Sequence, residues 1–61
     1  MATKEEFERE WKARDEEPKF IVLDFGWIAA TRYRIEGELI ELNYYTDKIA
    51  TIDLEQILRV I

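Results

Sequence analysis

The apolar residues of the chain concentrate in a nine-residue run, residues 20–28, which only Asp24 and Gly26 interrupt. A strand with one face in water alternates between apolar and polar residues, whereas a strand covered on both faces is apolar throughout. The run therefore predicts a central strand, residues 19–25, with both faces buried. Gly26 is predicted to make the tight turn that follows, because glycine adopts a positive φ angle without steric penalty.

A helix is predicted over residues 3–16. Thr3 and Glu6 have the spacing of a capping box, in which each side chain accepts a hydrogen bond from the backbone of the other residue. Acidic residues precede basic ones by four positions in three pairs, each worth about 0.2–0.5 kcal/mol if formed: Glu5–Arg9, Glu8–Lys12 and Glu10–Arg14. Pro18 marks the limit of the helical pattern.

Phe7 and Trp11 are the large apolar residues of this predicted helix and lie one turn apart. Such a narrow apolar stripe suits a helix that lies as a lid on a sheet. We therefore expect these two side chains to cover the outer face of the central strand.

The remaining pattern has a period of two and predicts further strands. They are expected over residues 27–35, 39–45 and 49–52. The small pair Ala29 and Ala30 marks where the long second strand would bend to serve two sides of a barrel. Turns are expected at residues 36–38, which contain Gly37, and at 46–48.

Residues 53–61 have two interpretations. Asp53 and Gln56 match a capping box, and the apolar residues that follow keep helical spacing, which would make a terminal helix. The alternative is one turn of 3-10 helix followed by a short strand, residues 58–61. Four of the last five residues are apolar and three are β-branched, which favours the strand.

Composition limits the classes of function. The 61 residues fit a single domain, 1–61, and include neither cysteine nor histidine, so we expect no disulfide, no metal site and no cofactor. A net charge of −5 disfavours nucleic acid and anionic membranes as partners. The chain has no apolar run of membrane-spanning length and no signal-peptide pattern, so a soluble, cytosolic protein is expected.

The order of these elements resembles the Sm-like fold, including its bacterial RNA-chaperone branch. Residues 20–27 align with the first hairpin of that family, residues 34–40 with its second hairpin and residues 52–61 with its closing strand, turn and strand. The last segment is also similar to small archaeal chromatin proteins with SH3-like barrels. The resemblance implies a mainly β fold with one N-terminal helix, residues 3–16, and a five-stranded barrel, residues 19–61.

The Sm-like resemblance also implies a possible homo-oligomer, because an uncovered edge at the last two strands would invite subunits to pair. It does not carry over an RNA site. Phe25 stands in the turn where that family has a polar asparagine, and no Lys–His pair precedes the final strand.

One candidate interaction surface is predicted at Arg32, Tyr33, Arg34 and Tyr45, where basic and aromatic residues alternate and could stack nucleic-acid bases. The structural alternative places Tyr33 in the core and pairs the arginines with Glu36 and Glu41.

No catalytic site is predicted. The Asp24-Phe25-Gly26 tripeptide lacks the rest of a kinase and is interpreted as a turn. The carboxylates around the second hairpin and those of residues 15–17 are interpreted as solvated groups.

Local signals and global pattern agree along most of the chain, as in designed proteins. The leading hypothesis is therefore a stable, non-enzymatic barrel scaffold of designed origin. The alternative is a natural interaction module that self-associates or binds a partner protein through a barrel edge. A single-stranded nucleic-acid binder is the third hypothesis.

Overall fold

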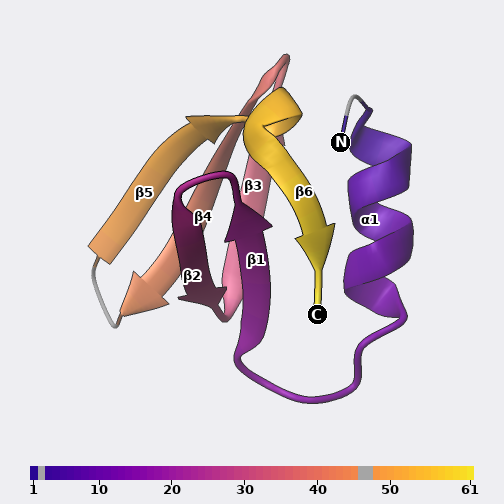
Figure 1. Cartoon of the computed structure of the whole chain (residues 1–61), viewed down its shortest axis with the longest axis vertical. Coiled ribbons are helices and arrows are strands. Elements are labelled where there is room, and N and C mark those ends of the chain that lie inside the picture. Colours follow the sequence, from indigo (N-terminus) through magenta and orange to yellow (C-terminus); the bar gives the residue numbers. More distant parts are fainter. Residues whose placement is uncertain (2, 46–47) are drawn as a thin grey trace.

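The computed structural model describes residues 1, 3–45 and 48–61, with the Tyr45 side chain left out. This part of the chain is mainly β with one helix, α1 (Lys4–Lys12), as Figure 1 shows. The strands are β1 (Lys19–Leu23), β2 (Gly26–Ala30), β3 (Arg32–Glu36), β4 (Leu39–Tyr45), β5 (Lys48–Asp53) and β6 (Ile57–Val60). One turn of 3-10 helix, η1 (Leu54–Gln56), connects the last two strands. None of the helices in the described part of the chain has the length and apolarity needed to cross a membrane.

The strands form two antiparallel three-stranded sheets. The first sheet has the order β2-β1-β6 and the second the order β3-β4-β5. The single strand expected over residues 27–35 is therefore two strands, and the described chain has six strands where five were expected. The break falls at Thr31, one residue after the predicted bend, because each half of this segment pairs in a different sheet.

The helix begins as predicted and ends early. The Thr3 hydroxyl accepts a hydrogen bond from the Glu6 N–H, and the Glu6 carboxylate accepts one from the Thr3 N–H, both at 3.2 Å. The helix stops at Lys12 instead of residue 16, with Ala13 as its C-cap. Carboxylates at residues 15–17 would lie at the negative end of a longer helix, which disfavours extension.

None of the three helical ion pairs expected from four-residue spacing forms in the described helix. Glu8 instead accepts a hydrogen bond from Tyr33 in β3. Glu10 and Arg14 both bind the backbone of Val60 in β6. Partners from the sheets replace the weak pairs along the helix surface.

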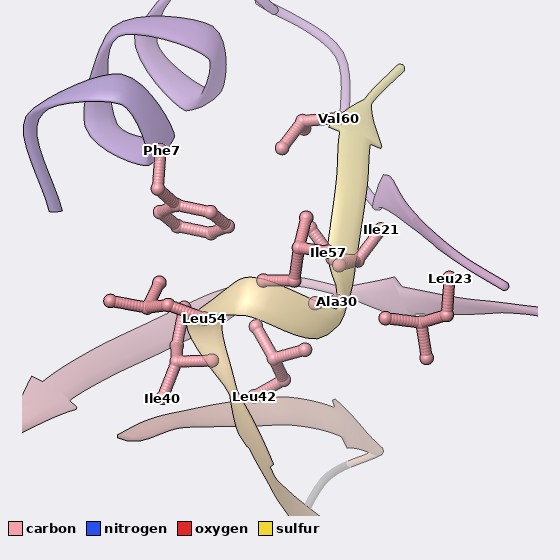
Figure 2. Close-up of a cluster of buried hydrophobic side chains, with 9 residues drawn as sticks. All are labelled: Phe7, Ile21, Leu23, Ala30, Ile40, Leu42, Leu54, Ile57 and Val60. Atoms are coloured by element: carbon pink, nitrogen blue, oxygen red, sulfur yellow. The ribbon is translucent and has the colours of Figure 1, made fainter. Parts of the chain in front are cut away.

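Side chains from both sheets, α1 and η1 form one core (Figure 2). Its buried members are Phe7, Ile21, Leu23, Ala30, Ile40, Leu42, Leu54, Ile57 and Val60. The alternation along residues 39–45 predicts that Ile40, Leu42 and Tyr44 face inward. Ile40 and Leu42 are fully buried, whereas Tyr44 is 43% exposed, so the prediction is confirmed for the first two and wrong for Tyr44.

The prediction that both faces of the central strand are covered is wrong for its outer face. On the outer face of β1, Phe20 is 38% exposed and Val22 is half-buried. Phe25, in the turn after β1, and Trp27, in β2, are 75% and 64% exposed. The inner residues of β1 are buried as expected. The helix does not cover the outer face, because Phe7 points into the core and α1 lies beside β6 (Figures 1 and 2).

The second interpretation of residues 53–61 is confirmed, since η1 is followed by the short strand β6. Gln56 accepts a hydrogen bond from the Asp53 N–H at 3.1 Å, as the capping spacing predicted. The second hairpin turns at Gly37, whose φ of 63° favours glycine. Of the turn predicted at 46–48, residues 46 and 47 lie outside the described part.

Candidate interaction surfaces

Three of the four residues predicted to form one surface have described side chains, and these three do not share one face. Within β3 the exposure alternates, so that Arg32 and Arg34 are exposed and Tyr33 between them is half-buried. Tyr45 ends β4, and its side chain lies outside the described part of the chain. The structure therefore brings the two arginines to one face and turns Tyr33 to the other.

Tyr33 packs beneath the helix. Its ring makes edge contacts with Phe7 and Trp11, each with ring centroids 4.9 Å apart. Its hydroxyl donates a hydrogen bond to Glu8 Oε2 at 2.9 Å. Burial, and then the hydrogen bond to Glu8 and the charge of that carboxylate, raise the pKa of Tyr33 to about 12. The phenol is therefore a neutral donor that fastens α1 to the second sheet.

Arg34 is held by two carboxylates. Its Nε and Nη2 atoms lie 3.2 Å from the two carboxylate oxygens of Glu41, its cross-strand neighbour, and Nη1 lies 3.2 Å from Glu36. The hydrogen bonds from Arg34 and its charge lower the pKa of Glu41. Arg32, by contrast, is exposed and forms no ion pair with the described residues. The structural alternative paired both arginines with Glu36 and Glu41, and among the described residues only Arg34 forms these pairs.

The outer edge of β6 is occupied by side chains of the segment containing the helix. Glu10 Oε1 accepts a hydrogen bond from the Val60 N–H at 2.9 Å, and Arg14 Nη2 donates one to the Val60 carbonyl at 2.9 Å. On the other edge, Phe20 and Ile61 exchange backbone hydrogen bonds of 2.8 and 2.9 Å. Glu10 and Arg14 thus satisfy the two backbone groups that a neighbouring strand would otherwise pair. We call this arrangement the β6 clamp.

An apolar surface lies on the outer side of the first sheet. Phe20 and Trp27 stack edge to face, with ring centroids 5.3 Å apart. Ile61 is paired to Phe20 and is 51% exposed. The sequence left two alternatives for Trp27 and Ile61, exposure at an interface or burial by the barrel and helix, and the structure exposes both. It also exposes Phe20, for which the apolar run predicted burial.

Two grooves border this surface. The first, about 460 Å³, is lined by residues 13–18 together with Phe20 and Ile61. The second, about 640 Å³, lies between β2 and the second sheet and is lined mostly by apolar groups. Its lining residues are Trp27, Ile28, Ala29, Tyr44 and Ala50.

Two carboxylates of the second hairpin, those of Glu36 and Glu41, have a structural role because they hold Arg34. Glu38 contributes its backbone carbonyl, which accepts a hydrogen bond from the Leu54 N–H at 2.9 Å. A general acid needs a raised pKa, whereas the pKa of Glu41 is lowered. Among the residues described, no group of three or more acidic, histidine or cysteine side chains is arranged to hold a metal ion.

Comparison of the chain with protein-family models, with curated proteins and with solved structures finds no match.

Proposed function

We propose that the chain is a small β-barrel of the SH3-like and Sm-like kind, in which β2 and β3 are two halves of one bent strand. Support comes from the junction, where the Thr31 N–H donates to the Asn43 carbonyl at 2.9 Å and so continues the pairing of β3 with β4. β1 pairs with both β2 and β6. Counting the bent strand once gives five strands.

Amide hydrogen exchange tests this topology. If the bent strand is continuous along β4, the Thr31 amide exchanges as slowly as amides inside β3. Exchange at the rate of the turn at Gly37 would mean that β2 and β3 are independent strands and would rule out the five-stranded barrel.

Within this fold, we propose a non-catalytic scaffold of designed origin. The observation that carries this proposal is that the polar side chains between the helical segment and the sheets form hydrogen bonds that hold these elements together. Tyr33, Glu8, Glu10 and Arg14 could each take part in chemistry, yet each has a hydrogen-bonded partner that joins one element to another. The capping interactions at Thr3 and at Asp53, and the turn at Gly37, are further local features that agree with the fold.

Thermal unfolding tests the scaffold proposal. Idealised designed domains are typically hyperstable, with a melting temperature above about 90 °C. A reversible transition in the ordinary mesophilic range of about 45–65 °C would contradict an idealised scaffold.

Interaction through a barrel edge is the second candidate, and the free edge of β5 favours it. β5 pairs only with β4 within the described residues, and its Ile49 is 55% exposed. The outer edge of β6 is held by the β6 clamp, so β5 offers the more accessible edge. Light scattering tests this candidate, since pairing through β5 would give a concentration-dependent mass above that of the monomer.

Nucleic acid is the least supported ligand. Arg32 is the one arginine of the predicted surface without an ion-pair partner among the described residues, and the Tyr33 ring is covered by Phe7 and Trp11. A titration with short single strands at low ionic strength should leave tryptophan fluorescence unchanged. A saturable change would revive this hypothesis.

A further inference from the structure

The loop between α1 and β1 and the end of the first sheet form a groove lined by acidic and apolar residues. It is lined by residues 13–18, Phe20 and Ile61, and we call it the acidic groove. We call the acidic lining residues Asp15, Glu16 and Glu17 its rim and the apolar lining residues Pro18, Phe20 and Ile61 its floor. In Figure 1 the loop passes below β1, close to the end of the chain after β6.

The floor of the acidic groove is apolar and continues onto the outer side of the first sheet. Pro18, Phe20 and Ile61 line it. Phe20 then stacks on Trp27, which is 64% exposed. Clustered exposed apolar groups of this kind are characteristic of binding surfaces.

The rim carries uncompensated negative charge. Asp15, Glu16 and Glu17 are exposed and form no ion pair with the described residues. Arg14 is the one cationic residue in the lining, and its guanidinium is bonded to the Val60 carbonyl. A groove with an apolar floor and an anionic rim complements a partner that is apolar and cationic.

We propose that the acidic groove binds a cationic amphipathic peptide segment of a partner protein. An apolar side chain of the peptide packs on Phe20 and Ile61, while a lysine or arginine next to it lies opposite Glu16 and Glu17. A groove of about 460 Å³ accepts only a short segment. Interfaces below roughly 1,200 Å² are typical of transient complexes, so we expect the interaction to be transient.

Charge selects this partner over the other possible occupants. A second copy of the chain, with its net charge of −5, would on average be repelled by the acidic groove. Nucleic acid and anionic lipid would be repelled for the same reason. Arg59 pairs with Val22 in the first sheet and is exposed. Its positive charge repels the basic residues of the peptide, so these residues bind at the loop end of the surface. This inference goes beyond the scaffold proposal and does not depend on it.

The test uses a short fluorescein-labelled peptide of alternating leucine and lysine, with fluorescence anisotropy measured at low ionic strength. Its counterpart of alternating leucine and glutamate is the probe control. The expected result is saturable binding of the lysine peptide, weakened by added salt, and no binding of the glutamate peptide. Failure of the lysine peptide to bind would overturn the proposal, while the melting temperature of the chain would still report separately on the scaffold.

Matched variants locate the binding site. The double change E16Q/E17Q should weaken binding roughly threefold to tenfold, as expected for the loss of two exposed ion pairs. E5Q/E55Q removes the same charge at exposed positions outside the groove and should change binding less than about twofold. Equal losses in the two double variants would indicate attraction to net charge alone and would overturn the proposal.

A second matched pair tests the apolar floor. Ile61→Ser should weaken binding, whereas Ile49→Ser, at a similarly exposed isoleucine in β5, should not. Circular dichroism of each variant verifies the fold. An unchanged affinity in Ile61→Ser, or an equal loss in Ile49→Ser, would show that the peptide binds elsewhere.

Light scattering of the free chain adds a further outcome, because self-association that prevents peptide binding would assign the groove to a second copy instead.

Discussion

Tyr33 joins the helix to the second sheet by two kinds of contact at once. Its ring lies against Phe7 and Trp11, and its hydroxyl donates to Glu8. The sequence allows Tyr33 to be either a base-stacking group or a core group, and the alternation in β3 supports both roles equally. Only the position of α1 determines which face of β3 is covered.

The raised pKa of Tyr33 predicts a pH-dependent stability. The folded pKa of about 12 lies above the ordinary value of 10.0, so folding favours the protonated phenol. The stabilisation is fully present below pH 10 and is lost as the pH rises toward 12. Urea unfolding across this range should show a steeper decline for the native sequence than for Tyr33→Phe. Parallel declines would contradict the assignment.

Phe7 and Phe25 provide a matched test of burial. Phe7 is fully buried and Phe25 is 75% exposed. Phe7→Ala should lower the free energy of unfolding by about 3–5 kcal/mol, because it leaves a cavity in the core. Phe25→Ala should change it by no more than about 0.5 kcal/mol. Chemical denaturation of both variants checks this, and similar losses would show that the turn at Phe25 is buried.

At the scale of the elements, the contacts of the helical segment explain which predictions failed. Capping and alternation are local signals, and they correctly located the start of α1 and the inward positions of Ile40 and Leu42 in β4. At residues 53–61 the capping spacing was compatible with a terminal helix, and the apolar, β-branched composition correctly favoured a turn and a strand. The direction in which α1 docks depends on tertiary contacts, which local sequence patterns do not specify. Because α1 lies beside β6, it leaves Phe20 and Trp27 exposed, and Glu10 and Arg14 bind the backbone of Val60 instead of pairing with each other.

The β6 clamp predicts unequal effects for two arginines. Arg14→Ala and Glu10→Ala should each lower the free energy of unfolding by about 1–2 kcal/mol, since each removes a charge-assisted hydrogen bond to Val60. Arg9→Ala is the control, because Arg9 is exposed and forms no ion pair with the described residues. Its effect should remain within about 0.5 kcal/mol. Equal effects of Arg14→Ala and Arg9→Ala would refute the clamp.

For the whole molecule, the net charge opposes the association between copies that the exposed apolar surface favours. The net charge of −5 keeps copies of the chain apart at neutral pH, although Trp27, Phe25 and Ile61 lie open to solvent. The balance of charge could be predicted from the sequence, whereas the exposed apolar surface could not, because it depends on where α1 leaves the first sheet uncovered.

Association should therefore be strongest near the isoelectric point of about 4.6. Light scattering is expected to rise as the pH approaches this value, because repulsion between copies vanishes while the apolar surface remains. Trp27→Ser should reduce the rise. Circular dichroism measured in parallel distinguishes association of folded chains from acid unfolding, and a rise unaffected by Trp27→Ser would implicate another surface.

The pairing of β1 with β6, together with the β6 clamp, bears on how the chain folds. The helical segment finds its hydrogen-bonded partner at Val60, and β1 takes one of its two neighbouring strands from the same part of the sequence. The two hydrogen bonds of the clamp join residues 46 and 50 positions apart, so the helix gains this docking place only when distant parts of the chain have met. We expect the chain to acquire its structure in a single cooperative event and not progressively from its N-terminal side.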